Sequence, residues 1–594
     1  MPNNTCECEN ELCIIMASQD VEILKTGQSN ERGKNMKKEM KRKAMALTLT
    51  SALAAMAIVP IAVQTNAMAT DDVTIDWFSD VSGWGPANWN GAETSPLMDS
   101  IKENFGVNFE IEQPATDADT KLALMIATDD LPDLISITDN ETITQLIESG
   151  YVWTIDEFME EYDPDSHLLS DFPEDVKEAV INSYGDFWFF PSHIDSVDHR
   201  ETYPLCSETY VNNVVYGQNS SIMFNTKIME DLGLTQEDVQ TQEAFMATLE
   251  KVANSGYTVD GEPIIVATMN ANLWLNSLDG VMSDSFGVVP VDAEGNYRMR
   301  ELNPGYKEVL KFTNDMVRNG YMDLNLLTLD ENALVTYIES GRVFCWFGNP
   351  AQADLSKSNM TSYGPILSDT GSVPTVGINS LAGTGWIKTF VSKNCENPEA
   401  LAKALSFATS EEGLWLNYYG VEGEDYTVQE NGTMVRTEEG LARYKDVYAQ
   451  NIWLWPFNDT DFFWATTPGP EEQADGANGS DLAYSIACSA LGRWDTTYIY
   501  NSGLLTTVNA NPLEASSDLG IKYTQIKNYL ESQKAKIISA TSDEEFEKEY
   551  QNMIDTLNEY DAEAVDSALN EYLQTACEQY DQSIENPNAE VYGE

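Results

Sequence analysis

Residues 71–81, DDVTIDWFSDV, begin the segment whose pattern most clearly indicates the fold class. Apolar and polar residues alternate there, which is typical of a strand with one buried face. A helical segment at 95–106 and a second strand at 107–113, VNFEIEQ, follow. Residues 117–137, DADTKLALMIATDDLPDLISI, then predict a helix, a turn and a third strand. This β-α-β-α-β order predicts a mainly parallel sheet covered by helices, and hence an α/β fold.

The same alternation returns further along the chain. Residues 220–234, SSIMFNTKIMEDLGL, run from a strand into a helix. A helix is expected at 241–255 with Thr241 as its N-cap, and another at 305–320. From Ile521 onward the pattern is helical. Because 594 residues are too many for one hydrophobic core, two or more domains are expected.

The N-terminal region has the pattern of a secretory signal. A basic segment at 36–43, MKKEMKRK, precedes an apolar run at 44–63 and the small residues AMA at 67–69. We interpret 36–69 as a signal peptide and expect a secreted, extracellular protein associated with the cell surface. Residues 1–35 are interpreted as a non-native upstream extension. No cysteine follows the apolar run, so a lipid anchor would lack its lipobox cysteine.

The charge balance limits the partners. The chain has 33 Lys and Arg against 97 Asp and Glu, a net charge of −64. Such a surface repels phosphate backbones and anionic lipids, so nucleic acid is not expected as a partner. Neutral or cationic ligands are favoured. The five cysteines beyond the signal peptide are far apart and odd in number, which does not indicate a disulfide framework.

Motifs for common chemistries are missing from the sequence. No dinucleotide fingerprint, phosphate-binding loop, zinc-protease motif or nucleophile elbow occurs in a fitting context. His167, His193 and His199 fall within 33 residues, and Asp195 and Asp198 lie among them. Their spacing matches no metal-ligand motif, so the metal hypothesis is weak. We expect no catalytic residue, no metal and no cofactor.

The tryptophans are more informative. There are thirteen, and many follow predicted strands or lie in loops. Ligands of open α/β sheets bind outside the carboxyl ends of the strands, and an indole face suits the C–H face of a sugar ring. The alternative is that a large protein buries its tryptophans in the core. The predicted ligand-binding residues are Trp84, Trp89, Trp188, Trp274, Trp346, Trp386 and Trp455 for stacking, and Asn88, Asn270, Asp279 and Asn349 for hydrogen bonding.

Several segments resemble one protein family. Residues 131–137, LPDLISI, and the helix at 305–320 are similar to segments of extracellular solute-binding proteins, family 1. The most specific likeness is at 385–428, GWIKTFVSKNCENPEALAKALSFATSEEGLWLNYYGVEGEDYTV, which resembles the large carbohydrate-binding subgroup of Gram-positive bacteria. The resemblance implies a two-lobed, periplasmic-binding-protein-like fold of type II, with extra C-terminal helices.

The resemblance also implies a function. Such proteins capture a carbohydrate, often an oligosaccharide, in a cleft between the lobes and deliver it to the permease subunits of an ABC importer, without catalysis. We expect a monomer. The implied division is 70–215 plus 385–445 for the N-lobe, 216–384 plus 446–520 for the C-lobe, and 521–594 for the C-terminal helices.

Two alternatives remain open. A secreted glycoside hydrolase would need two carboxylates across a cleft, one with a raised pKa. A binding protein for a non-sugar ligand, such as a peptide, is the other. The acids at 410–428 do not decide between them, because Glu411 and Glu412 are expected in the first turn of a helix capped by Ser410. Glu422 stays a candidate structural or cleft-rim residue.

Overall fold

The first of the two larger β-sheets is built from strands on both sides of a long insertion. It contains β1 (Val73–Ser79), β2 (Val107–Glu112), β3 (Leu134–Ile137), β4 (Phe190–Pro191) and β13 (Lys388–Val391) in the order β2-β1-β3-β13-β4. Every strand except β13 runs in the same direction. The predicted mainly parallel sheet is confirmed here.

The coordinates are a computed structural model. The residues that it describes are 72–81, 95–114, 118–443, 458–467 and 479–593, all within the unit Ala69–Glu594. The predicted signal peptide and upstream extension lie outside them. In this described part of the chain, no helix is both long and apolar enough to cross a bilayer.

A buried chain of hydroxyl groups fixes where β13 pairs. Thr389 lies opposite Ser136 of β3, and their hydroxyl oxygens are 2.7 Å apart. The indole N–H of Trp77 in β1 donates to the same Ser136 oxygen at 2.8 Å. All three side chains are buried, so a shift in register would leave polar groups without partners.

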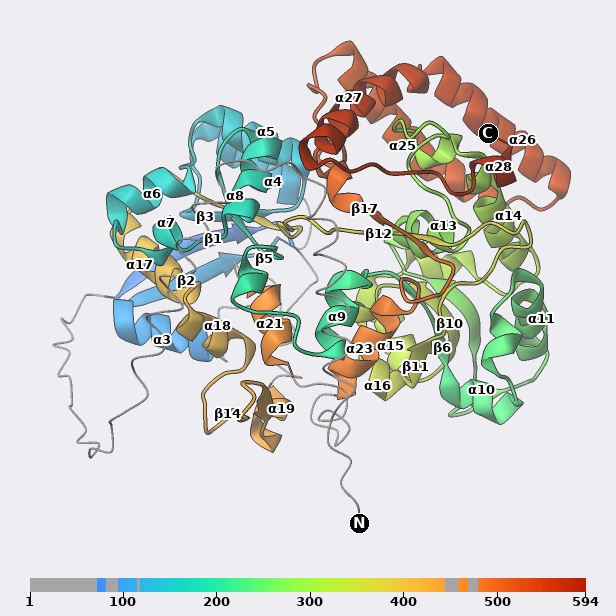
Figure 1. Cartoon of the computed structure of the whole chain (residues 1–594), viewed down its shortest axis with the longest axis horizontal. Coiled ribbons are helices and arrows are strands. Elements are labelled where there is room, and N and C mark those ends of the chain that lie inside the picture. The colour runs from blue at the N-terminus through green and yellow to red at the C-terminus, as the bar shows by residue number, and fades with distance from the viewer. Residues whose placement is uncertain (1–71, 82–94, 115–117, 444–457, 468–478, 594) are drawn as a thin grey trace, which may run out of the picture. The chain divides into compact units, whose positions relative to one another are not determined.

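Helices cover the first sheet as the sequence predicts. Helix α3 (Pro96–Phe105) begins where the Ser95 hydroxyl accepts from the backbone N–H of Met98 at 3.2 Å. It ends at Gly106, whose φ of 68° is left-handed and suits a glycine. Helix α17 (Pro398–Ala408) packs beside α3, as Figure 1 shows.

The second sheet has its own core. It contains β6 (Ser221–Asn225), β9 (Ile265–Met269), β10 (Val343–Gly348) and β11 (Met360–Ser362) in the order β11-β6-β10-β9. Only β6 runs against the others. Every residue of β10 is buried, because helices cover both faces of a central strand in a sheet of this type.

The helices beside the second sheet also follow the sequence. Helix α11 (Gln242–Ala253) is capped by Thr241, whose hydroxyl accepts from the N–H of Ala244 at 3.2 Å. Phe245 and Leu249 on its apolar face are fully buried. Helix α14 (Pro304–Arg318) occupies the segment expected to be helical at 305–320.

The chain passes between the sheets through short paired strands. Before β6 it forms β5 (His193–Ile194), which pairs with β16 (Asn458–Asp459). On its return to β13 it forms β12 (Thr375–Ile378), which pairs in parallel with β17 (Tyr498–Asn501). Both passages are therefore held by backbone hydrogen bonds to segments from much later in the sequence.

Three long helices close the chain. Helices α25 (Asp518–Ile538), α26 (Asp543–Glu559) and α27 (Ala562–Tyr580) pack against one another, and α14 packs against α25 and α26 (Figure 1). In α25 the ammonium of Lys534 is buried between two carboxylates. It lies 2.6 Å from Glu301 and 2.8 Å from Asp279. This buried ion cluster fastens α25 to the segments that precede α14.

Replacing Lys534 by methionine should destabilise the protein by about 3 kcal/mol. The substitution keeps most of the volume but leaves the Glu301 and Asp279 carboxylates without their buried partner, a change that typically costs 3–5 kcal/mol. Lys522→Met is the matched control, because Lys522 is in the same helix and pairs with the exposed acids Asp518 and Asp561. That variant should change the free energy of unfolding by less than about 1 kcal/mol. Equal losses in urea denaturation would contradict this assignment.

Candidate functional site

Three side chains gather at the carboxyl edge of the first sheet. Asp80 follows β1, and its Oδ2 accepts from the N–H and the hydroxyl of Thr138, at 2.7 and 3.0 Å. Thr138 follows β3 directly. Trp386 precedes β13, whose first residue Lys388 lies opposite Ile137 at the end of β3. The antiparallel pairing therefore places Trp386 beside the same edge.

Asp80 is a polar group that the sequence reasoning missed. Burial raises the pKa of its carboxyl to about 6, although hydrogen bonds from Thr138 act in the other direction. Its Oδ1 is buried and has no hydrogen-bond partner among the described residues. Such an oxygen favours a donor from a ligand or a water molecule. Its place directly after the first predicted strand was the available signal.

A second group lies at the carboxyl edge of the second sheet. Asn270 follows β9, and its Oδ1 accepts from the indole N–H of Trp346 at 3.1 Å and from the backbone N–H of Asn349 at 3.3 Å. Trp274 begins the short helix α12 (Trp274–Ser277) just beyond Asn270 and is half-buried. The structure thus brings four of the predicted residues to one edge.

The roles within this group differ. Trp346 is fully buried and presents no face to solvent, so in this structure it holds the amide of Asn270 in place. Direct stacking by Trp346 stays a prediction. Gly348 makes the arrangement possible: a Cβ there would lie 2.1 Å from the indole nitrogen and 2.3 Å from Asn270 Oδ1.

Other predicted residues lie elsewhere. Asp279 is engaged by Lys534 and accepts from the hydroxyl of Tyr306 at 2.5 Å. Trp188 donates its indole N–H to the carbonyl oxygen of Tyr184 at 3.1 Å and precedes β4, on the side away from Trp386. Outside the described residues are Trp84, Asn88, Trp89 and Trp455.

The three histidines occupy separate settings. His167 Nε2 is 2.9 Å from the carbonyl oxygen of Ser406, and His193 Nδ1 is 3.3 Å from the hydroxyl of Ser192. His199 Nδ1 is 2.6 Å from Asp459 Oδ2. Among the described residues, no group of three or more His, Cys, Asp or Glu side chains is placed to hold a metal ion.

His199 belongs to a buried network that ties two distant segments together. Asp461, fully buried, accepts from Arg200 Nε at 2.9 Å and from the hydroxyl of Tyr210 at 2.7 Å. Asp459 also accepts from the N–H of Phe462 at 2.9 Å. Burial lowers the pKa of His199, but the hydrogen bond and charge of Asp459 prevail, so the net shift is upward.

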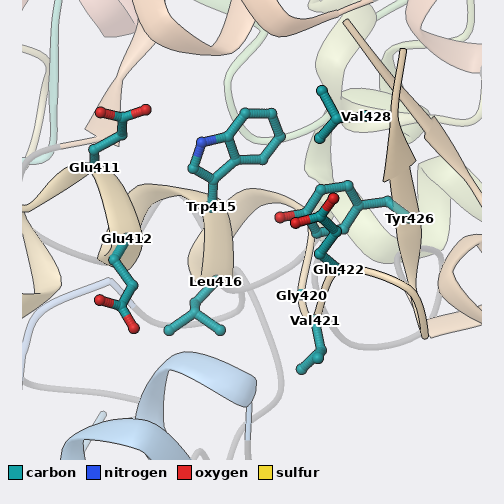
Figure 2. A pocket seen from close by; sticks show the side chains of 9 residues that line it. All are labelled: Glu411, Glu412, Trp415, Leu416, Gly420, Val421, Glu422, Tyr426 and Val428. Carbon is teal, nitrogen blue, oxygen red and sulfur yellow. The ribbon is translucent and has the colours of Figure 1, made fainter. Parts of the chain in front are cut away.

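A shallow cavity of about 610 Å³ lies on α18 (Glu411–Tyr418) and the loop that follows it (Figure 2). The Trp415 and Tyr426 rings stack with centroids 5.2 Å apart and planes at 6°. As predicted, Ser410 caps the helix and Glu411 lies in its first turn. Figure 2 shows Glu422 beside the Tyr426 ring. The lining residues are Glu411, Glu412, Trp415, Leu416, Gly420, Val421, Glu422, Tyr426 and Val428.

The family follows from a comparison of the sequence with family profiles. The profile of the bacterial extracellular solute-binding proteins matches residues 88–415, more than half of the chain. The chain belongs to this family. No curated protein matches the sequence. Residues 385–415 fall inside the matched range, and the expected resemblance to the solute-binding family is confirmed.

Solved structures of proteins described as substrate- or solute-binding proteins have a similar fold. The ABC-transporter substrate-binding protein FusA of S. pneumoniae, in complex with kestose, is 15% identical, with a TM-score of 0.60 over 85% of this chain and 99% of its own. An HMO-binding, ABC-transporter-associated protein of Bifidobacterium longum infantis is 13% identical, with a TM-score of 0.57 over 84% and 98%. The N-glycan transport solute-binding protein NgtS of S. pneumoniae is 15% identical, with a TM-score of 0.52 over 85% of this chain and 99% of its own. These likenesses confirm the expected two-sheet, solute-binding-protein fold.

The His199–Asp459 pair should make stability depend on pH. A histidine whose folded-state pKa is raised contributes stability that is fully present below its unfolded pKa of about 6.5 and is lost as the pH rises through the folded value. The difference in unfolding free energy between wild type and His199→Gln should therefore shrink from pH 6 to pH 9. Urea denaturation at several pH values measures it, and a difference that grows with pH would refute the assignment.

Gly348→Ala should distort the edge around Asn270. The new methyl group would overlap the Trp346 indole, and overpacking of this kind typically costs about 1–3 kcal/mol. The same substitution in a Trp346→Phe background should cost less, because the clashing indole nitrogen is gone. Thermal unfolding of the four proteins in this cycle measures the coupling. Additive losses would show that the indole is not the obstacle.

Proposed function

We propose that the protein captures an oligosaccharide and delivers it to the permease subunits of an ABC importer. The main support is the set of groups at the carboxyl edges of the two sheets. They are the exposed indole of Trp386, the Asp80 Oδ1 atom without a hydrogen-bond partner among the described residues, and the amide of Asn270. This is where ligands of open α/β sheets bind. The neighbouring structures with kestose, HMO and N-glycan in their descriptions support a carbohydrate as the ligand class.

The proposed binding residues come from both edges. Trp386, with 43% of its surface exposed, would stack on a sugar ring, and Asp80 Oδ1 would accept from a hydroxyl group. Asn270, Trp274 and Asn349 would contact the same ligand from the second sheet. The remaining candidates stay predictions: Trp84, Asn88, Trp89, Trp188, Asp279, Trp346 and Trp455.

We also propose how the protein works in its setting. The mature chain would act outside the cell as a monomer, after removal of a signal peptide at 36–69, with no catalysis of its own. The lobes would be 70–215 plus 385–445 and 216–384 plus 446–520. Ligand contact with both lobes would favour the closed form of the protein, which the permease would recognise.

One observation favours a second candidate function. The carboxyl of Asp80, with a pKa of about 6, is suited to donate a proton near neutral pH, as the acid of a glycoside hydrolase does. A reducing-sugar assay on the ligands that bind distinguishes the two. Turnover that is lost in Asp80→Asn would replace the transport proposal with the hydrolase.

The test is a binding screen on the protein beginning at residue 70. A panel of oligosaccharides that includes kestose should contain a ligand that raises the melting temperature, since a ligand at 100 times its dissociation constant adds about 2.7 kcal/mol. A peptide panel is the counter-screen. Binding of peptides and of no oligosaccharide would reject the carbohydrate proposal.

Two tryptophan variants locate the site. Trp386→Ala should weaken binding of the best oligosaccharide up to about tenfold, because a stacking contact adds about 0.5–1.5 kcal/mol beyond its area. Trp415→Ala is the matched control, since it removes the aromatic wall of the cavity in Figure 2. Isothermal titration should show little change for it. The reverse result would move the site to that cavity.

A further inference from the structure

Backbone hydrogen bonds clamp the turn that carries Trp386. Gly383 and Asp195 exchange backbone hydrogen bonds of 2.8 and 3.2 Å, and the N–H of Ser192 donates to the carbonyl oxygen of Ile387 at 3.0 Å. The turn between these two contacts holds Thr384, Gly385 and Trp386. Residues 192–195 thus fix both ends of a short turn whose exposed member is an indole.

The turn lies directly against that segment. A Cβ at Gly383 would be 2.8 Å from Asp195 Oδ2, and one at Gly385 would be 2.6 Å from the Ser192 hydroxyl oxygen. Gly385 also has a φ of 62°, which other residues rarely adopt. Two glycines therefore allow a close approach that leaves the backbone of the turn little room to move.

A buried lysine holds the middle of the turn. The ammonium of Lys388, a residue only 6% exposed, donates to the carbonyl oxygens of Gly385 and Thr384 at 2.5 and 3.4 Å. It also lies 5.7 Å from the centre of the Phe189 ring. Burial lowers the pKa of this amine to about 8.

The setting of Lys388 differs from that of the other buried lysine. Lys534 is paired with two carboxylates, which compensate the charge taken out of water. Within the described part of the chain, Lys388 forms no ion pair, and its donors are directed at the two residues before Trp386. A buried cation without an acidic partner costs stability unless hydrogen bonds compensate it, and the acceptors of Lys388 are the two carbonyl oxygens just before Trp386.

We propose that Lys388 is a positioning residue for Trp386: its buried ammonium holds the Thr384 and Gly385 carbonyls and so fixes the orientation of the exposed indole. The consequence for ligand binding rests on the proposed function. Because the turn is held before ligand arrives, less conformational entropy is lost on binding. The orientation itself is a property of the ligand-free protein and can be tested without a ligand.

The test is ¹⁹F NMR of the protein labelled with 5-fluorotryptophan. Trp386→Phe and Trp153→Phe assign two of the resonances. Lys388→Met should shift or broaden the Trp386 line and leave the Trp153 line unchanged. Lys393→Met is the matched control, because Lys393 donates to the carbonyl oxygen of Gly150 at 3.0 Å and lies 5.6 Å from the Trp153 ring. It should give the opposite pattern.

Two further experiments distinguish an effect of Lys388 on the position of Trp386 from an effect on folding. Lys388→Arg, which keeps the cation and its donors, should retain the wild-type Trp386 line. If Lys388→Met does not fold, raising the pH of the wild-type protein through 8 should move the Trp386 line by neutralising the amine. The titratable groups near the Lys388 amine are His193 and Asp195, and burial lowers the pKa of His193. Tyr184, which contacts the Phe189 ring, has a pKa raised by burial. If the Trp386 line does not move in Lys388→Met, or in the wild-type protein when the pH is raised through 8, the proposal is overturned.

A binding cycle then links position to affinity. For the best oligosaccharide of the panel, Lys388→Met should weaken binding about threefold or more in the wild-type background and not at all in a Trp386→Ala background. Equal losses in both backgrounds would overturn the role in binding. If no oligosaccharide binds, the proposed function fails while the NMR result still decides whether Lys388 positions the indole.

Discussion

The antiparallel insertion of β13 between β3 and β4 organises the first sheet and the groups at its carboxyl edge. It brings residues from near position 390 into a sheet that begins at Val73. The buried chain from the Trp77 indole through Ser136 to Thr389 makes one register better than its neighbours, because a slip would bury unpaired polar groups. That register also sets the place of Trp386, two residues before the strand.

Parallel strands explain why the candidate binding groups converge. In both sheets all strands but one run in the same direction, so the residues that follow them meet at one edge. In the first sheet, Asp80 and Thr138 reach the carboxyl edge from β1 and β3. In the second sheet, Asn270 and Asn349 reach the carboxyl edge from β9 and β10. The two sheets thus place polar side chains in the same way, although the residues differ.

Local patterns predicted the elements well. The strands β1, β2, β3 and β6, the helices α3, α11 and α14 and the Thr241 and Ser410 caps depend on neighbours within a few residues. Glu411 and Glu412 were likewise explained by their place in the first turn of a helix capped by Ser410. The candidate site was predicted less well: the sequence indicated Trp386 and Asn270, missed Asp80, and gave no sign that Asp279 is paired with Lys534. Burial and ion pairing involve residues far apart in the chain, so no local pattern reports them.

The α/β class, the order of the elements and membership of the solute-binding family could be inferred from the amino-acid sequence, because propensity, capping and motif spacing are local properties. Which tryptophans are exposed and which support other residues became clear from the three-dimensional packing. Trp346 lies within β10 and is fully buried, whereas Trp386 lies two residues before β13 and is 43% exposed. The difference arises because β10 lies inside its sheet with both faces covered, whereas Trp386 lies in a turn held at the sheet edge by Lys388 and residues 192–195.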